Sequence, residues 1–273
     1  MKIFIDSARL DEIEQAYNYG IIDGVTTNPS LIKKAVEKLQ ESGKNITMQE
    51  YIKKILITAK GNPVSLEVTE TSSDGMIRQA KKIYKMFNSI ANNVCIKIPV
   101  NPSFQDEKGK DFNGIKTIKI LSNLKIPINC TLIFTPEQAL LAAKAGANYV
   151  SPFAGRIDDY LRDQNDISYK KSDYFPAEGL EIDDEIISDN GINSGIDLVG
   201  QIIEVFTNYD IKCEVLAASI RNVRQAREAA IIGADIATLP FSVIRELLIH
   251  YKTQEGMKKF TADIVKEYAD LIK

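Results

Sequence analysis

The chain alternates short apolar runs with helical patterns along its length, and this alternation restricts its fold more than any other feature. Eight runs of strand length are bounded by turn residues and separated by segments with apolar residues at helical spacing. The predicted strands are residues 1–6, 24–28, 64–69, 94–99, 127–134, 148–153, 214–218 and 234–239. Strands that alternate with helices pair in parallel through right-handed crossovers. Eight such units predict one α/β domain over residues 1–273, closed as a (β/α)8 TIM barrel.

Several segments are additional to the eight strand–helix units of a minimal barrel. We expect insertions near residues 40–60 and 157–195, and an extra C-terminal helix over 256–272. The stretch from Arg156 to about Asn193 is predicted to be irregular; its acidity indicates a solvated surface, with a lid or partner contact as the alternative. A doubly wound open sheet is the competing fold, weakened because no G-x-G-x-x-G turn follows any strand.

Composition excludes several classes of function. A net charge of −3 among 273 residues gives no reason to expect nucleic acid or an anionic membrane as partner. Cys95, Cys130 and Cys213 lie far apart in apolar runs, which indicates buried free thiols rather than disulfides. The single histidine, His250, leaves a metal site or a His-based triad unsupported. No signal peptide or membrane-spanning run is recognisable, so we expect a cytoplasmic protein.

One lysine stands inside a predicted strand. Lys97 lies between Ile96 and Ile98 in an apolar run that ends at Pro99. Burial lowers a lysine pKa by roughly 3–5 units from about 10.4, which supplies a neutral amine able to form a Schiff base with a carbonyl. The alternative is an edge-strand lysine whose stem packs while its charge reaches water.

Polar residues recur where the other strands end. Barrel active sites lie at this face, and side chains alternate between the barrel interior and the helix layer. If Lys97 points inward, the residues expected beside it are Asp6, Thr26, Asn28, Glu67, Thr69, Asn129, Thr131, Ser151, Phe153 and Ser219. Each alone has an ordinary role, such as capping a helix for Asp6 or Ser219, or making a turn before Pro29 for Asn28. Together with Lys97 they come from seven strands, and as a set they indicate a site.

The residue types suggest the chemistry of this site. Asp6 can accept a hydroxyl proton when a carbon–carbon bond breaks, and Glu67 with Thr131 can hold a proton-carrying water. Arg156 follows the sixth strand, and Ser219 and Arg221 follow the seventh. Two guanidiniums, a hydroxyl and a helix N-terminus suit a phosphate group, although each arginine alone can be a surface charge.

Five short motifs resemble the signatures of transaldolases. They are Phe4-Ile5-Asp6, Gly24-Val25-Thr26-Thr27-Asn28-Pro29-Ser30, Ile96-Lys97-Ile98-Pro99, Ser151-Pro152-Phe153-Ala154-Gly155-Arg156 and Ala218-Ser219-Ile220-Arg221. The resemblance runs in order from Met1 to about Pro240. It implies a class I, Schiff-base transferase of the pentose phosphate pathway. Such an enzyme moves a dihydroxyacetone unit from sedoheptulose 7-phosphate or fructose 6-phosphate to erythrose 4-phosphate or glyceraldehyde 3-phosphate, without a metal or organic cofactor.

The resemblance also implies roles for individual residues. Lys97 would form the Schiff base, Asp6 would be the acid and base, and Glu67 with Thr131 would bind the relay water. The other positions would bind substrate: Asn28, Asn129 and Ser151 the dihydroxyacetone unit, and Arg156, Ser219 and Arg221 the phosphate. Thr26 and Phe153 are also expected to contact the substrate.

Two alternatives stay open at this stage. Fructose 6-phosphate aldolase shares the fold and the lysine but releases free dihydroxyacetone; this relative carries Gln in place of Glu67 and Tyr in place of Phe153, so both positions favour the transferase. A catalytically silent barrel that binds sugar phosphates is the third hypothesis. We expect sugar phosphates as the small-molecule partners and a homo-oligomer as the assembly.

Overall fold

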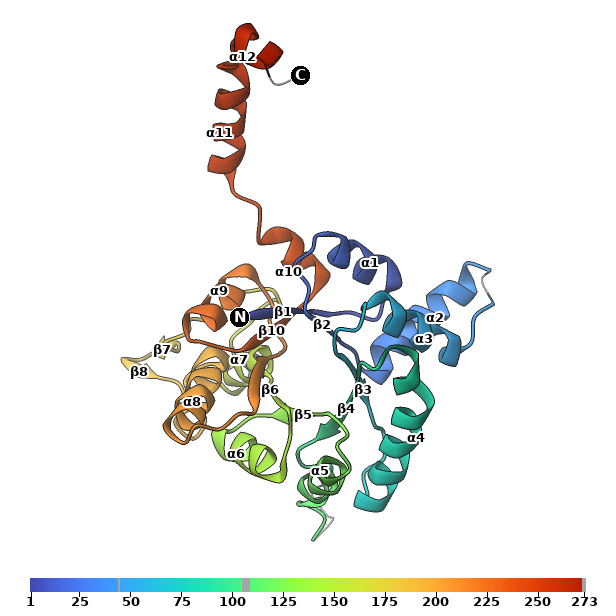
Figure 1. The fold of residues 1–273 in the computed structure, drawn as a ribbon. Helices are drawn as coiled ribbons and strands as arrows, with labels where there is room; N and C mark the ends of the chain where they lie inside the picture. The colour runs from blue at the N-terminus through green and yellow to red at the C-terminus, as the bar shows by residue number, and fades with distance from the viewer. Residues whose placement is uncertain (44, 105–108, 272–273) are drawn as a thin grey trace.

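A computed structural model, which describes residues 1–43, 45–104 and 109–271, contains a closed barrel of parallel strands (Figure 1). Its strands are β1 Lys2–Asp6, β2 Gly24–Thr26, β3 Val64–Glu67, β4 Val94–Pro99, β5 Ile128–Ile133, β6 Tyr149–Pro152, β9 Glu214–Ala217 and β10 Ile236–Leu239. They are hydrogen-bonded in the order β1-β10-β9-β6-β5-β4-β3-β2. The predicted (β/α)8 barrel is confirmed. Residues 44, 105–108 and 272–273 lie outside the described residues; residue 44 falls in the predicted insertion near 40–60 and residue 272 in the predicted helix over 256–272.

Most of the helices surround the barrel (Figure 1). They are α1 Leu10–Asn18, α2 Pro29–Glu41, α3 Met48–Thr58, α4 Ser73–Ala91, α5 Asn113–Asn123, α6 Pro136–Ala145, α7 Ala154–Gln164, α8 Gly195–Asn208, α9 Val223–Ile231, α10 Phe241–Glu246, α11 Tyr251–Ala262 and α12 Lys266–Leu271. The insertion near 40–60 holds α3, which starts at a capping box formed by Thr47 and Glu50. In the described ranges, no helix combines the length and apolar character needed to span a membrane.

Side chains along the strands alternate, as predicted, between the helix layer and the barrel interior. Ile5, Val25 and Ile96 belong to the large apolar core between the barrel and its helices. Phe4, Leu216, Ala218 and Ile236 form a separate small cluster with Tyr149 and Phe153, and alternate residues of these strands reach the barrel interior. Apolar side chains thus fill part of the barrel interior. The three cysteines are buried free thiols, as expected.

The segment after β6 differs from the prediction. Residues expected to be irregular from Arg156 onward begin instead as α7, Ala154–Gln164, and a short antiparallel hairpin of β7 Glu181–Ile182 and β8 Glu185–Ile186 follows. The buried face of α7 includes Asp158 and Arg162, so charged residues occupy positions where an apolar stripe would reveal a helix. Within residues 157–195, the part that lies outside the barrel's helices is therefore the stretch between α7 and α8.

The C-terminal region also differs. A single helix over 256–272 was expected, but α11 starts earlier, at Tyr251, and is separated from α12 by a short break. In Figure 1 both helices extend away from the barrel. His250 precedes α11 and accepts a hydrogen bond from the backbone N–H of Lys252, so it caps a helix.

Candidate active site

Lys97 lies in the middle of the barrel wall and is buried. Its exposed fraction is 7%, so the alternative of an edge lysine reaching water is wrong. On β4 it pairs in register with Glu67 of β3 and Asn129 of β5. Its Nζ lies 3.5 Å from Oε2 of Glu67 and 5.7 Å from the ring centroid of Phe153. A carboxylate and an aromatic face therefore flank the amine.

Asp6 stands at the end of β1 in a hydrogen-bonded row. The hydroxyl of Thr26 donates to Oδ1 of Asp6 at 2.8 Å, and Thr26 also shares a hydrogen bond of 2.5 Å with Thr238. Burial raises the pKa of Asp6 above 3.8, while the Thr26 hydrogen bond and the charge of Lys97 act in the opposite direction. A carboxyl with a raised pKa is suited to hold or release a proton.

A cavity of about 120 Å³ brings most of the predicted residues together. It is lined by Asp6, Thr26, Asn28, Lys97, Ser151, Phe153, Arg156, Leu216, Ala218, Ser219 and Thr238. These residues come from six strands and the loops after them, at the face where barrel enzymes hold their substrates. Asn28 has two roles. It lines the cavity, and its Oδ1 accepts a hydrogen bond from the backbone N–H of Leu31, which caps the N-terminus of α2.

Three predicted residues lie close to Lys97 in the barrel wall but do not line this cavity. Glu67 is the neighbour on β3 described above. Asn129 is fully buried, accepts a hydrogen bond of 2.6 Å from Ser151 and donates one of 3.2 Å to Ser65. Thr131 is also fully buried, and within the described part of the chain its Oγ1 has no hydrogen-bond partner. Because the hydroxyl of Ser151 donates its hydrogen bond to Asn129, Asn129 fixes the orientation of that hydroxyl.

The predicted phosphate residues surround the start of α7. The guanidinium of Arg156 lies over the ring of Phe153, 5.0 Å from its centroid, and lines the cavity. Arg221 is placed differently: it donates to Oδ2 of Asp159 at 2.7 Å and to the carbonyl of Ser219 at 3.2 Å. Arg156 thus faces the cavity, whereas Arg221 is held by an ion pair behind Ser219.

Sequence reasoning missed three residues of this region. Thr238 lines the cavity from β10, and as the one polar residue of that strand it could have been found by the same alternation rule. Ser65 alternates with Glu67 on β3 and was equally accessible to that rule. Asp159 pairs with a residue 62 positions away, for which the sequence carries no signal.

The fold and the site together define a (β/α)8 barrel with a buried lysine beside a carboxylate and with an arginine lining the adjacent cavity. Comparison with known proteins identifies the family. The family model described as Transaldolase/Fructose-6-phosphate aldolase matches residues 3–271. This chain belongs to the transaldolase/fructose-6-phosphate aldolase family.

Similar proteins span nearly the same length. A protein of Thermoplasma volcanium named probable transaldolase is 42% identical over 99% of this chain and 98% of its own length. Proteins of the same name from Thermoplasma acidophilum and Chlorobium chlorochromatii are 40% and 41% identical, over 99% and 96% of this chain and 98% and 97% of their own lengths.

Proposed function

We propose that this protein is a transaldolase that transfers a dihydroxyacetone unit between sugar phosphates through a Schiff base on Lys97. The observation that carries the proposal is the burial of Lys97 within the barrel strand β4, with Glu67 beside it and Asp6 in the same cavity. The family and the names of its relatives support the activity. The pentose phosphate pathway is the setting we infer from these substrates.

The first half of the reaction forms the Schiff base. The amine of Lys97, once it has given up its proton, attacks the C2 carbonyl of the ketose phosphate, giving a carbinolamine that loses water to become an iminium. Glu67 is near enough, at 3.5 Å from Nζ, to exchange protons with the reacting centre through one water. The hydroxyl of Thr131, which has no hydrogen-bond partner among the described residues, can bind that water.

The second half breaks and remakes a carbon–carbon bond. Asp6 takes the proton of the C4 hydroxyl while the C3–C4 bond breaks, the aldose phosphate leaves, and the bonding electrons remain in an enamine on Lys97. The enamine carbon then attacks the acceptor aldehyde, Asp6 returns its proton to the new hydroxyl, and hydrolysis frees the amine. The raised pKa of Asp6 suits both directions of this proton transfer.

Neutral and charged groups divide the binding of substrate. Asn28 and Ser151, supported from behind by Asn129, can bond the hydroxyls of the three-carbon unit. Arg156 and Ser219, with the first turn of α7 and the ion-paired Arg221, can hold the phosphate. A phosphate at this end places the reactive carbonyl toward Lys97.

Borohydride trapping tests the proposal. The protein is incubated with fructose 6-phosphate, with or without erythrose 4-phosphate, reduced, and analysed by intact-mass and peptide mass spectrometry. We expect a reduced dihydroxyacetone adduct on the Lys97 peptide that diminishes as acceptor is consumed and sedoheptulose 7-phosphate forms. Lys97→Met should abolish both the adduct and turnover. Exposed Lys125→Met is the matched control and should retain both.

Other outcomes would contradict the proposal in distinct ways. The same adduct with steady release of free dihydroxyacetone, independent of acceptor, would make the protein an aldolase. Binding of sugar phosphate without any reducible adduct would indicate a catalytically silent barrel. Full turnover by Lys97→Met would exclude the Schiff base on this lysine.

A further inference from the structure

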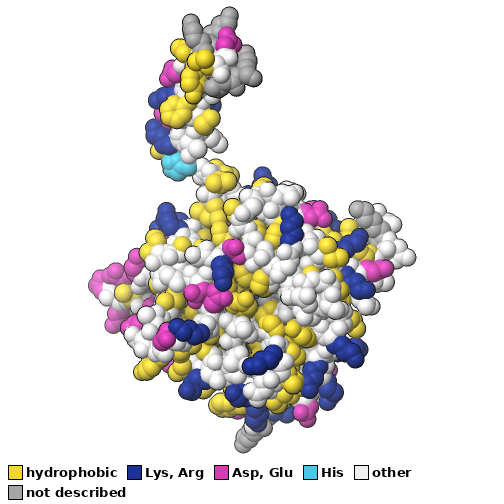
Figure 2. Space-filling view, viewed as in Figure 1, with side chains coloured by type: hydrophobic (Ala, Val, Ile, Leu, Met, Phe, Trp, Pro, Cys, Tyr) yellow, Lys and Arg dark blue, Asp and Glu magenta, His cyan; other side chains and the backbone are white. Residues whose placement is uncertain are grey.

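The acidic residues that follow β6 are divided between the surface and the interior. The β7–β8 hairpin carries Glu181, Asp183, Asp184 and Glu185, all exposed, and Figure 2 shows acidic side chains gathered on that edge of the molecule. Asp158 of α7 lies in the interior instead, with an exposed fraction of 2%. A buried carboxyl group is unfavourable unless it is hydrogen-bonded, so its partners indicate what it does. The proposed reaction gives this carboxyl group no role.

Three helices meet at Asp158. Its Oδ1 accepts a hydrogen bond of 2.7 Å from the backbone N–H of Gly195, the first residue of α8. Its Oδ2 accepts one of 2.5 Å from the side-chain amide of Gln225 on α9, which is itself 1% exposed. Both carboxyl oxygens are therefore bonded, and the group joins α7 to α8 and α9.

Gln225 connects this carboxyl group to the residues that follow β9. We call residues 219–221 the phosphate loop, because they include Ser219 and Arg221 of the proposed phosphate site. Oε1 of Gln225 accepts a hydrogen bond of 2.8 Å from the backbone N–H of Arg221. A carboxylate can only accept hydrogen bonds, so Asp158 holds the amide nitrogen of Gln225 toward itself and leaves the amide oxygen for Arg221.

The phosphate loop has a conformation that needs support from its surroundings. Ser219 has a φ of +60°, in the left-handed region that a residue with a Cβ adopts only where other contacts hold it there. Arg221 folds back on the same residue, since its Nε donates to the carbonyl of Ser219 at 3.2 Å. A shift in the backbone of Arg221 would therefore move the hydroxyl of Ser219 and the guanidinium together.

Helix capping is the alternative role for Gln225. It is the third residue of α9, whose N-cap is Asn222, and a glutamine at this position commonly bonds a backbone N–H at the start of the helix. Gln138 makes the same contact on α6, where it accepts the N–H of Phe134 at 2.8 Å, and no carboxylate among the described residues bonds its amide. A cap of this kind therefore does not require the buried Asp158.

We propose that Asp158 and Gln225 are positioning residues for phosphate binding: the carboxyl group of Asp158 orients the amide of Gln225, which holds the phosphate loop in its binding geometry. This inference rests on the phosphate site of the proposed function, to which it adds two residues that do not line the cavity. It implies that the polarity of the pair, in addition to its shape, determines the affinity for phosphate.

Exchanging the two functional groups tests the role of polarity. Asp158→Asn keeps the shape of the side chain but turns a second amide nitrogen toward that of Gln225. Gln225 relieves this contact only by rotating its amide, which takes the oxygen away from the N–H of Arg221. In the double variant Asp158→Asn/Gln225→Glu, the new carboxylate accepts from the new amide and from Arg221. The double variant thus restores each hydrogen bond and the net charge.

Phosphate titration and kinetics provide the measurements. Burial raises the pKa of Asp158 to about 7, so both are made at about pH 8, where its carboxyl group is ionised. We expect Asp158→Asn to raise the Kd of inorganic phosphate and the KM of fructose 6-phosphate about 10-fold, with kcat within about 2-fold, because a buried donor loses its acceptor. The double variant should return both constants to within about 3-fold of wild type.

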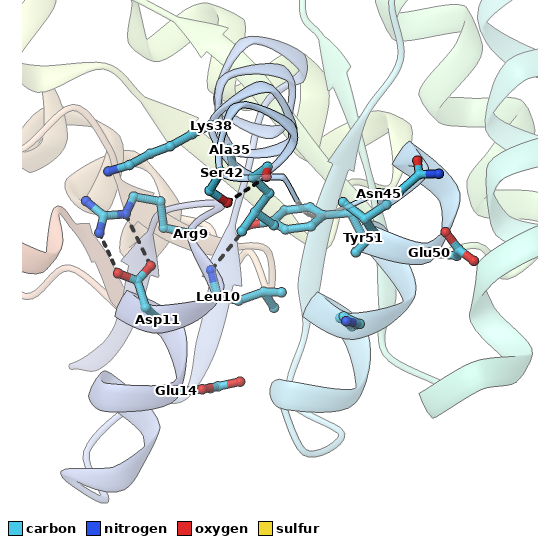
Figure 3. Close-up of a pocket in the computed structure, with 13 residues that line it drawn as sticks. Arg9, Leu10, Asp11, Glu14, Ala35, Lys38, Ser42, Asn45, Glu50 and Tyr51 are labelled. Carbon is cyan, nitrogen blue, oxygen red and sulfur yellow. Dashed lines mark hydrogen bonds and ion pairs between the residues drawn. The ribbon is translucent and has the colours of Figure 1, made fainter.

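Asp11→Asn is the matched control for the chemical change. The carboxylate of Asp11 pairs with Arg9 beside a cavity of about 920 Å³ between α1, α2 and α3 (Figure 3). None of the described residues that line this cavity belongs to α7 or α9. Asp11→Asn should therefore keep the wild-type Kd and KM.

Several results would overturn the inference. Wild-type phosphate affinity in Asp158→Asn would do so, and so would a double variant that fails to fold or that binds phosphate as weakly as the single one. If Asp158→Asn alone fails to fold, the phosphate affinity of the double variant decides. The phosphate titration needs no turnover. A wild type that shows these binding effects without transferring a three-carbon unit would overturn only the proposed transaldolase activity, whereas a wild type that binds no phosphate would overturn this inference and leave the Schiff base untouched.

Discussion

Gly155 is the residue at which a single methyl group is expected to disturb the proposed phosphate site. It lies in the first turn of α7, packed against the loop that follows β9. A Cβ added to Gly155 would lie 2.3 Å from the carbonyl oxygen of Ser219 and 2.5 Å from Nε of Arg221. A backbone carbonyl cannot rotate away, so the loop and α7 must separate by roughly 1 Å. Overpacking of this kind costs about 1–3 kcal/mol of unfolding free energy.

The displacement acts on binding geometry without removing any polar group. Ser219, Arg221 and the start of α7 all move, while Lys97 on β4 stays in place. A misplacement of about 1 Å in a positioning group costs up to about 100-fold in rate. We therefore expect Gly155→Ala to lower kcat/KM for phosphorylated ketoses by about 10–100-fold, mainly through KM, and to lower Tm by several degrees.

The assay compares phosphorylated with unphosphorylated ketose donors, alongside thermal melting. Gly256→Ala is the matched control, because an added Cβ there meets open space in an exposed helix. It should keep wild-type kinetics and slightly favour α11 by helix propensity. Wild-type kinetics and Tm in Gly155→Ala would refute the steric reasoning. An equal loss for unphosphorylated donors would refute the location of the phosphate site.

Three further predictions follow from single side chains. Arg156→Ala should raise KM for phosphorylated donors while leaving unphosphorylated ones nearly unchanged; equal effects on both would contradict its proposed role. Burial raises the pKa of Asp158 from 3.8 to about 7, so the folded chain holds a proton that the unfolded chain releases. Unfolding free energy should therefore fall by on the order of 4 kcal/mol from this group as pH rises from about 4 to 7, and urea titrations of Asp158→Asn should show a flatter dependence. Asn28→Ala should lower the unfolding free energy by about 1 kcal/mol and also weaken binding of the donor substrate. Thr135→Ala removes the cap of α6, away from the cavity, and should lower only the unfolding free energy. Equal kinetics in the two variants would show that Asn28 acts only as a helix cap.

Local signals in the sequence were sufficient for the architecture. Alternating side chains and turn residues identify the strands, because the period of two is a property of each strand by itself. The same period predicted that Asp6, Lys97 and Ser151 would line one interior, and they do line one cavity. Thr238 on β10 follows the same period of two and lines the same cavity, so this period also predicts its position.

Tertiary packing decided what local patterns could not express. The helical character of α7 is hidden because Asp158 and Arg162 occupy its buried face, where partners distant in sequence satisfy them. The guanidinium of Arg221 is turned toward Asp159 by an ion pair that no spacing reveals.

The sequence by itself determined a (β/α)8 barrel with a lysine among polar strand ends, because strand periodicity and turn chemistry act over a few residues. Only the tertiary structure decided which of those polar groups open into the cavity and which support them from behind. It also showed that the last helices leave the barrel, where the pattern alone predicted only that a helix forms. Orientation, burial and pairing depend on contacts between residues far apart in the chain, and these exist only once the barrel has closed.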